Sequence, residues 1–576
     1  MSAPADPAGP PTATTDSPPG TAPDFTAPMS RRQVLQALSG LFMGMFVAIL
    51  AATVVANALP TIIPELGGSQ SVYTWIVTAE LLAMTATVPL WGKLADLADQ
   101  KLLIQLSFGL FLVGSVLAGA AQDTTMLIVA RVLQGAGAGG LTALVQIVMA
   151  AMIPPRELGR YAGVFGAIFA VGTVAGPLIG GVLVDTSWLG WRWCFFLGVP
   201  FTLVAMLLIQ RTLTLPPVQR RERVHVDWLG ALLLTAGVST LLIWVTLAGN
   251  SFDWLSAQTA LMVGGAVVLL VLAVVVEARS PEPVIPLGLF RNRTVTLAIV
   301  ASALVGIAMF GGTVFLSQYF QVALGYSPTR AGLLSLPLVA GLLVSSTVVG
   351  GLITRNGLWK RWLVLGGVLM VAGFGLLATI DAATSTWLLG AYMVVLGAGV
   401  GMLMQNLVLA AQNDVAAAEL GTTTSTVSFF RSLGGTIGVS VLGAILAARV
   451  ADGLGALGGG APAPGGGEAA APDVSALPPE VVALVQGTYA DATAELFLVA
   501  TPLAALALLV VLFIPEKPLK TTSGSQRLAE EQAPARSGEE QVPARSGEEQ
   551  APARSGEEQA PARSGGEGSA PAPLAH

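Results

Sequence analysis

The stretch GTVAGPLIGGVLVDTSWLGWRW, Gly172–Trp193, is apolar for most of its length and ends in a polar, tryptophan-rich segment. Gly172, Gly176 and Gly180 recur at a spacing of four, so a helix would carry them as one stripe. Helices in lipid pack closely where such small residues meet a neighbour, because lipid supplies little hydrophobic force between helices. Pro177 lies in the same run and can bend it. The stretch therefore predicts a bendable, closely packed membrane helix.

The composition extends this prediction to the whole chain. The 576 residues are 53% hydrophobic and 11% charged, with a mean hydropathy of +0.73. In soluble domains about a quarter of all residues are charged, so the chain is predicted to be an integral membrane protein. One cysteine, Cys194, and two histidines, His225 and His576, leave too few ligands for a disulfide framework or a Cys/His metal site. We expect neither a metal nor a cofactor.

Apolar runs recur from about residue 35 to about residue 515, and each can cross the ~30 Å hydrocarbon core as a helix. They predict about fourteen transmembrane helices and an all-α integral membrane fold. Lysine and arginine residues are concentrated in every second connection between the predicted helices. The positive-inside rule then places these connections and both chain termini in the cytoplasm.

Low-complexity sequence marks both ends of the chain. Residues 1–30 predict a disordered tail, and residues 517–576 predict a second one that holds four nine-residue repeats of the type EEQAPARSG. Between the tails, GKLADLADQK (Gly92–Lys101) and GGLITRNGLWK (Gly350–Lys360) share a G-x-L helix end followed by a cationic turn. This similarity indicates an internal duplication, as in many transporters.

The duplication and the spans together predict the domain organisation. We expect a six-helix bundle at 31–212, two extra transmembrane helices with linkers at 213–292, and a second six-helix bundle at 293–516. The second bundle would contain an external loop at about 451–490, where the sequence is rich in glycine, alanine and proline.

Several motifs occur in order along this framework. They are LIVARVLQGAGAGG (127–140), GPLIGG (176–181), WLGWRWCFFLGVP (188–200) and VLAAQNDVAAAELGTTTSTVSFFRSLGGTIG (408–438). Together they resemble the major facilitator superfamily, and within it the fourteen-helix drug/proton antiporter branch of EmrB/QacA type. The resemblance implies two six-helix bundles plus two extra central helices. It also implies a secondary active exporter, not an enzyme, that works by alternating access in the bacterial cytoplasmic membrane.

The glycine stripe acquires a more specific meaning from this resemblance. Gly172, Gly176, Pro177, Gly180 and Gly181 match the family's antiporter motif, which is thought to limit proton leak. The alternative, from the residues alone, is that the stripe only packs two helices together.

Arg131 is the most informative charged residue within a predicted span. A guanidinium inside the membrane costs at least ~2.5 kcal/mol, so it should face a cavity or a partner. Gln134 lies three residues further on, on the same helix face, where it can bond to Arg131. The resemblance links Arg131 to proton transfer, and a structural role is the alternative. Arg431 is similar but lies nearer the cytoplasmic end, where it can also snorkel to the interface.

A proton antiporter also needs a titratable group, and here the chain departs from the family pattern. In LAATVVANALP, Leu50–Pro60, Ala51 stands where the family has an aspartate. Glu80 is the acid deep in a predicted span, and it lies seven positions after Tyr73. Ala51 lies nine positions before Pro60. At ~1.5 Å per residue the two depths are similar. We therefore expect Glu80 to couple transport to protons or to bind a cationic drug, with structural pairing as the alternative.

The cationic turn GKLADLADQK resembles the family's conformational latch in part. Gly92, Asp96 and Lys101 match the pattern, whereas two of its basic positions and a glycine are replaced. In the family, the aspartate lies near a helix N-terminus, where the helix dipole favours a negative charge. We expect Asp96 to keep this role.

Polar residues in the spans are candidates for a substrate cavity. They are Asn57, Gln134, Gln146, Gln318, Tyr319, Gln405, Asn406 and Arg431. Any of them could instead form an interhelical hydrogen bond. No Walker-type phosphate loop is present in the sequence, so a proton gradient is the expected energy source.

The sequence therefore predicts a proton-coupled exporter of amphipathic, cationic drugs. The expected partners are protons, a small amphipathic substrate and membrane lipid, with no nucleic acid, and the expected state is a monomer. Export of an endogenous lipid, siderophore or antibiotic is the second hypothesis. A non-transporting membrane receptor is a remote third, because it would leave the glycine motif and Arg131 without a purpose.

Overall fold

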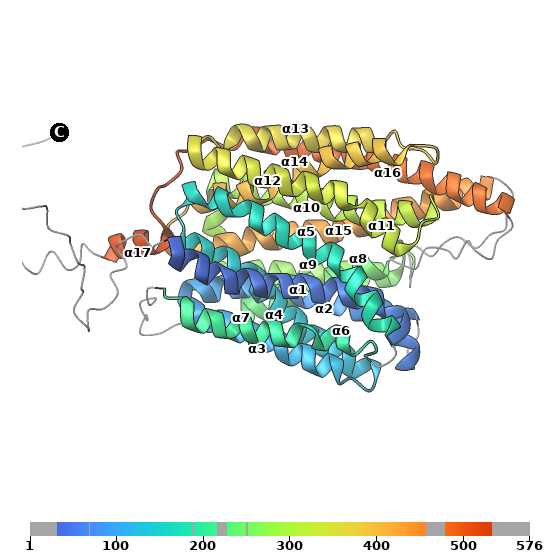
Figure 1. Cartoon of the computed structure of the whole chain (residues 1–576). Helices are drawn as coiled ribbons and strands as arrows, with labels where there is room; N and C mark the ends of the chain where they lie inside the picture. The colour runs from blue at the N-terminus through green and yellow to red at the C-terminus, as the bar shows by residue number, and fades with distance from the viewer. Residues whose placement is uncertain are drawn as a thin grey trace, which may run out of the picture. The chain divides into compact units, whose positions relative to one another are not determined.

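Long apolar helices lie side by side in the computed structural model of the chain (Figure 1). The structure describes residues 31–67, 70–186, 189–215, 227–248, 252–456 and 479–532. Within these ranges, thirteen helices are long and apolar enough to cross a membrane. Helix α5, with 31 residues, also exceeds the length that a bilayer requires. The predicted all-helical membrane fold with about fourteen spans is therefore confirmed.

The helices form two series. The first series, here the N-terminal half, consists of α1 (Arg31–Glu65), α2 (Gln70–Leu97), α3 (Gln100–Gly119), α4 (Thr124–Met152), α5 (Pro155–Asp185), α6 (Trp193–Phe196) and α7 (Gly198–Thr212). The second series, here the C-terminal half, consists of α10 (Arg293–Val322), α11 (Pro328–Leu334), α12 (Leu336–Asn356), α13 (Lys360–Leu377), α14 (Thr386–Asn413), α15 (Leu420–Ala456) and α16 (Pro479–Leu512). The remaining helical elements are α8 (Trp228–Leu247), α9 (Ala257–Glu277), η1 (Leu287–Arg291), η2 (Ala417–Glu419) and α17 (Gly524–Gln532).

The two halves repeat one packing pattern. In the N-terminal half α1 packs against α5 and α7, and α4 packs against α2 and α3. In the C-terminal half α10 packs in the same way against α15 and α16, and α14 against α12 and α13. The contacts between the halves are also paired, because α2 packs against α15 as α12 packs against α5. The structure thus shows a duplication at the level of helix packing.

The bundle has two ends. The Asp96 face is the end at which α2, α4, α12 and α14 finish and α3, α5, α13 and α15 begin. The Trp191 face is the opposite end. Several helices begin with a side-chain cap that accepts a backbone amide hydrogen, such as Asp99 before α3 and Asp123 before α4. These caps explain why the helices begin where they do.

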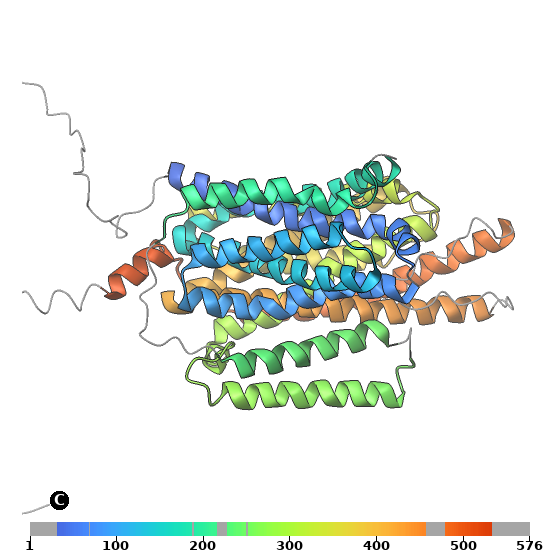
Figure 2. The ribbon, with the colours of Figure 1, turned by 90° about the horizontal axis from the view of Figure 1, so that it is seen from below.

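The two extra helices form a hairpin beside the bundle, seen as a separate layer in Figure 2. Helix α8 packs against α9, and also against α2 of one half and α15 of the other. Most of the α9 surface is exposed and apolar, as expected for a helix that faces lipid. The connection after α9 is held by an ion pair in which Lys93 Nζ lies 2.6 Å from Glu282 Oε2.

Two expected boundaries differ from the structure. The predicted external loop at 451–490 is shorter at both ends, because α15 continues to Ala456 and α16 begins at Pro479; residues between them lie outside the described ranges. The tail predicted to be disordered from residue 517 is ordered through α17. Polar contacts with the bundle, described below, hold this segment, and composition alone could not reveal them.

Candidate functional site

A charged network lies buried within the N-terminal half. Glu80 of α2 and Arg131 of α4 form an ion pair, and both are at least 96% buried. Arg131 Nη1 donates to Gln134 Oε1 at 2.7 Å, as the i,i+3 spacing predicts. Gln134 Nε2 in turn donates to Ser115 Oγ of α3 at 2.9 Å. The network therefore joins three helices through one chain of polar groups.

Glycines allow these helices to approach closely enough to form the network. A Cβ atom at Gly135 of α4 would overlap the backbone of Glu80. A Cβ atom at Gly114 of α3 would likewise overlap the backbone of Gln134. The glycine-rich segment after Arg131 is thus a packing surface for α2 and α3, in agreement with its small-residue composition.

The two charges of this network are paired and buried. Arg131 Nε finds no hydrogen-bond partner among the described residues. Two buried ions are costly unless they are paired, and removal of one partner leaves the other uncompensated. The pair is therefore sensitive to any event that changes the charge of Glu80 or moves α2 relative to α4.

The glycine stripe of α5 packs against α1. Cβ atoms at Gly172 and Gly176 would meet the side chains of Ile49 and Thr53, and Thr53 Oγ1 donates to the carbonyl oxygen of Gly172 at 3.0 Å. Gly180 is also buried. Pro177 and Gly181 lie on the same helix, but their surroundings are outside the described part of the structure. The stripe thus holds two helices of one half together at close range.

Asp96 connects the two halves at the Asp96 face. Its carboxylate accepts hydrogen bonds from the backbone amides of Gly421 and Thr422, each at 2.7 Å, and from the Thr422 hydroxyl. Both amides belong to the first turn of α15, whose free amides and dipole favour a negative charge. Asp96 of one half therefore caps a helix of the other half.

The remaining residues of the expected latch divide between two locations. Gly92 lies one turn before Asp96, where a Cβ atom would overlap Ser425 and the carbonyl of Gly421. Lys101 instead donates to the carbonyl oxygen of Gln210 near the end of α7, at 2.7 Å, within its own half. The structure therefore places Gly92 and Asp96 at the junction of the halves and Lys101 away from it.

The duplicated position in the C-terminal half makes the equivalent contact. Gly350 of α12 lies against Gly159 of α5, and a Cβ atom on either would overlap the backbone of the other. Arg156 donates from Nε to the carbonyl of Thr354 at 3.4 Å and from Nη2 to that of Arg355 at 3.3 Å. The halves are thus in backbone contact at two symmetry-related places on the Asp96 face.

Among the described residues, a smaller cavity lies beside this junction and a larger one lies farther from the Asp96 face. The smaller, about 30 Å³, is lined by Gln146, Gln405, Asn406 and Gln412 together with apolar residues of α4, α5 and α14. The larger, about 130 Å³, lies in the C-terminal half among α10, α11, α12 and α14, with Met309, Leu316 and Met393 in its wall. The first can hold about two water molecules, and the second approaches the ~150 Å³ of an apolar cavity that binds benzene.

The predicted substrate residues do not form one cavity. Gln146, Gln405 and Asn406 meet at the smaller cavity, whereas Gln134 belongs to the charged network. Tyr489 donates to Gln318 Oε1 at 2.8 Å, and fully buried Tyr319 donates to the carbonyl of Asp381 at 2.7 Å. These last two therefore join elements within the C-terminal half.

Two further candidates remain. Arg431 is 8% exposed, and its Nη1 atom has no hydrogen-bond partner within the described ranges. The Asn57 side chain lies outside what the structure describes.

Some residues of these arrangements were not predicted from the sequence. The first turn of α15, with Gly421 and Thr422, binds the Asp96 carboxylate. Asp96 lies 325 positions before Gly421 in the chain. The run of threonine and serine at 422–426 in an otherwise apolar span was the available signal. The larger cavity has no comparable signal, because its lining is ordinary apolar sequence.

Comparisons with known proteins agree with this architecture. The model of the Major Facilitator Superfamily matches residues 41–439. An uncharacterized MFS-type transporter of Mycobacterium tuberculosis is 36% identical over 489 residues, covering 85% of this chain and 70% of the relative. The multidrug transporter protein MdtP of Bacillus subtilis is 35% identical over 423 residues, covering 73% of this chain and 76% of the relative.

A solved structure shares the fold. The proton:xylose symporter XylE, bound to 6-bromo-6-deoxy-D-glucose, superimposes with a TM-score of 0.58 at 13% identity. The match covers 87% of this chain and 99% of XylE. At this identity the likeness concerns the arrangement of helices alone.

Proposed function

The chain belongs to the Major Facilitator Superfamily, and from this premise we propose that it exports amphipathic compounds in exchange for protons. It is a multi-pass membrane transporter, and a relative that it resembles over most of its length is named a multidrug transporter. The proposal adds the direction of transport, the proton coupling, the cationic character of the preferred substrates and the bacterial cytoplasmic membrane as location.

The distribution of charge supports the proposed orientation. The described basic residues at or near the Asp96 face are Arg32, Lys93, Lys101, Arg156, Arg160, Arg211, Arg279, Arg291, Arg293, Arg355, Lys360, Arg361, Lys517, Lys520 and Arg527. Those near the Trp191 face are Arg192, Arg330 and Arg449. By the positive-inside rule the Asp96 face lies in the cytoplasm, which also places the beginning of α1 and the end of α16 there.

The buried pair of Glu80 and Arg131 carries the proposal of proton coupling. A carboxylate inside a membrane span is expensive and by default marks a functional site. While Arg131 contacts it, Glu80 is stabilised as an anion. If α2 and α4 shift and Arg131 withdraws, the buried charge is uncompensated, and uptake of a proton removes this cost. One proton can thereby be bound in one conformation and released in the other.

The junction of the halves supplies the conformational part of the mechanism. The contacts of Asp96 with α15 and of Gly159 with Gly350 close the Asp96 face. Export requires that this face open to admit substrate from the cytoplasm and then close again. Because both contacts depend on close fit, the closed state is a distinct arrangement and not a continuously variable one.

The larger cavity supports an amphipathic substrate. Its wall contains methionine, leucine, valine and small polar residues, and none of its lining residues is charged. Methionine adapts its shape to different ligands, which suits a transporter of several compounds. A cationic group on the substrate would have to be attracted elsewhere, and among the described residues of the N-terminal half Glu80 is a buried carboxylate suited to this role.

Transport into inverted vesicles tests the proposal. A fluorescent cationic dye, a neutral analogue and an anionic analogue are offered under an imposed pH gradient to the parent, Glu80→Gln and Glu495→Gln. Glu495 is a glutamate on α16 that is about 40% exposed and pairs with Arg449 at the surface, so its change is a matched control.

We expect gradient-driven uptake of the cationic dye by the parent and the control, and its loss in folded Glu80→Gln protein. Uptake by Glu80→Gln with unchanged pH dependence would contradict the role of Glu80. Absence of dye transport by the parent would favour an endogenous substrate.

A further inference from the structure

We propose that residues 515–531, here the C-terminal strap, hold the Asp96 face closed by bridging the two halves, and that the strap separates from the N-terminal half when this face opens. The strap includes nearly all of α17 and follows the last helix of the bundle (Figure 1). The inference rests on the alternation of the two halves described above. It does not depend on proton coupling or on the identity of the substrate.

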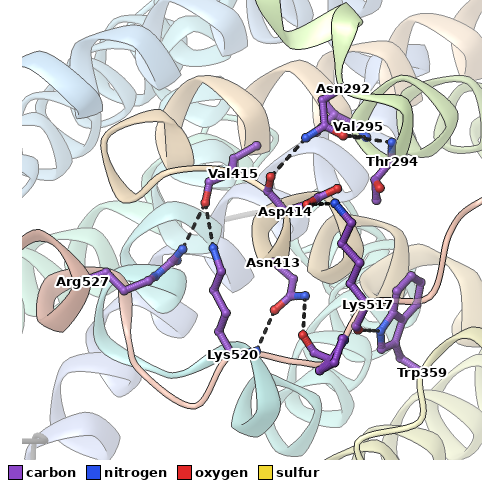
Figure 3. Close-up of polar contacts among 11 residues, drawn as sticks. Asn292, Thr294, Val295, Trp359, Asn413, Asp414, Val415, Lys517, Lys520 and Arg527 are labelled. Carbon is purple, nitrogen blue, oxygen red and sulfur yellow. Dashed lines mark hydrogen bonds and ion pairs between the residues drawn. The ribbon is translucent and has the colours of Figure 1, made fainter. Parts of the chain in front are cut away.

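The strap is clipped to the end of α14. Asn413 binds its backbone on both sides of Leu519, donating from Nδ2 to the carbonyl of Pro518 at 3.0 Å and accepting at Oδ1 from the Lys520 amide at 2.8 Å (Figure 3). Lys517 Nζ lies 2.6 Å from Asp414 Oδ1. Trp359 Nε1 donates to the carbonyl of Lys517 at 2.8 Å. These contacts fix the first part of the strap to the C-terminal half.

A single carbonyl then receives two cationic side chains of the strap. Lys520 Nζ and Arg527 Nη1 each donate to the carbonyl oxygen of Val415 at 3.1 Å, as Figure 3 shows. Arg527 is 8% exposed, so this contact is shielded from water. Because Val415 lies in the connection between α14 and α15, the strap is held against the segment that leads to the helix capped by Asp96.

The same strap also contacts the N-terminal half. The Arg156 amide, in the first turn of α5, donates to the carbonyl of Lys520 at 3.3 Å. Gly524 lies where a Cβ atom would meet the Ala150 carbonyl and the Ala151 Cα of α4, and also Leu420 of α15. Gly524 is therefore seated at the point where α4 of one half and α15 of the other come together.

The contacts of the strap with the two halves are unequal. The C-terminal half provides an ion pair, the two-sided clip of Asn413 and the carbonyl of Val415. The N-terminal half provides one backbone hydrogen bond and the α4 side of the packing around Gly524. When the halves separate at this face, the weaker set breaks first. The strap thus travels with the C-terminal half, and its docking on α4 and α5 adds to the stability of the closed state.

Spin-label distances across the Asp96 face test this inference in the full-length chain. Cys194 is changed to Ala, and labels are attached at Glu157→Cys of α5 and Asn356→Cys of α12, both exposed positions. Gly524→Leu prevents docking on α4 but leaves the clip of Asn413 intact. Thr521→Leu, at an exposed position of the strap, is the matched control. A chain that stops after Ser523 removes α17 and serves as the second variant if Gly524→Leu does not fold.

We expect the population with long label separation to rise by about tenfold in Gly524→Leu and in the shortened chain, because both changes weaken the docking of the strap on the N-terminal half. Thr521→Leu should match the parent. Equal distributions in the parent, Gly524→Leu and the shortened chain would overturn the inference. If the parent then shows two separations, alternation of the halves stands without the strap; if every protein shows one separation, alternation fails as well.

Discussion

Gly159 of α5 and Gly350 of α12 lie in backbone contact across the two halves, and neither position has room for a methyl group. This contact has a counterpart at Gly92, which meets α15 in the same way. The Gly159–Gly350 contact joins α5 of the N-terminal half to α12 of the C-terminal half. The Gly92 contact joins the equivalent helices of the opposite halves, α15 and α2. The fit of small residues, more than polar bonding, therefore determines how closely the halves can approach at this face.

A larger side chain at this contact should prevent closure of the Asp96 face. Gly350→Leu is expected to shift the molecule toward the open state and to reduce export by about tenfold or more, because backbone atoms cannot give way to the new side chain. Gly351→Leu is the control, since a Cβ atom at Gly351 meets nothing within 4 Å. The distance between spin labels at Glu157→Cys and Asn356→Cys measures the shift. Equal distance distributions in both variants would refute the prediction.

Loss of the carboxylate at Asp96 should weaken the junction without unfolding either half. Removal of a helix cap costs roughly 0.5–2 kcal/mol, so Asp96→Ala should shift the equilibrium toward the open state by about 2- to 30-fold. Asp99→Ala is the matched control, because Asp99 caps α3 through the amide of Leu102 within its own half. The same label distances measure both variants. A shift in Asp99→Ala as large as that in Asp96→Ala would assign the effect to general loss of stability.

The pair of Glu80 and Arg131 should show strong coupling in stability. Arg131→Met leaves a buried carboxylate without its partner and should destabilise the protein by about 3–5 kcal/mol. The double variant Glu80→Gln/Arg131→Met should recover much of this loss, because neither charge remains. Thermal unfolding in detergent provides the comparison. If the effects of the two changes simply add, the two residues do not interact as the structure shows.

Filling the larger cavity should reduce transport of bulky substrates. Ala308 lines this cavity and is 4% exposed, so Ala308→Phe places a ring in or beside it. A change of one methylene in an apolar pocket changes kcat/KM by about tenfold or more. The ring of Ala308→Phe should lower kcat/KM at least as much. Val300→Phe, on the same helix at a 41% exposed position, is the control. Identical kinetics in both variants would show that substrate does not enter this cavity.

Much of the fold could be predicted from local sequence. The apolar runs, the glycine spacing of four in α5 and the similarity of the segments at Gly92 and Gly350 are local features, and each corresponds to something observed. The bond from Arg131 to Gln134 was also predictable, because helix geometry alone brings positions three apart together.

The candidate site was predictable only where a residue was exceptional in its surroundings. Glu80 and Arg131 stood out as charges in apolar runs, but their pairing across two helices did not follow from either run. Tyr319 and Gln318 were as polar as Gln405 and Asn406, yet the first two bond within the C-terminal half and the second two line a cavity. Polarity in a span reveals that a partner is needed and does not identify it.

The sequence by itself determined that this chain crosses a membrane many times, that it is duplicated and that charges at two buried positions require compensation. Hydropathy, small-residue spacing and the cost of a buried charge are properties of single helices, so they can be read along the chain. Tertiary structure alone decided that Asp96 caps α15, that Gly159 meets Gly350, and that residues 515–531 bridge the two halves. These contacts join residues far apart in the chain, and their partners are backbone groups, which every residue possesses and no sequence pattern distinguishes.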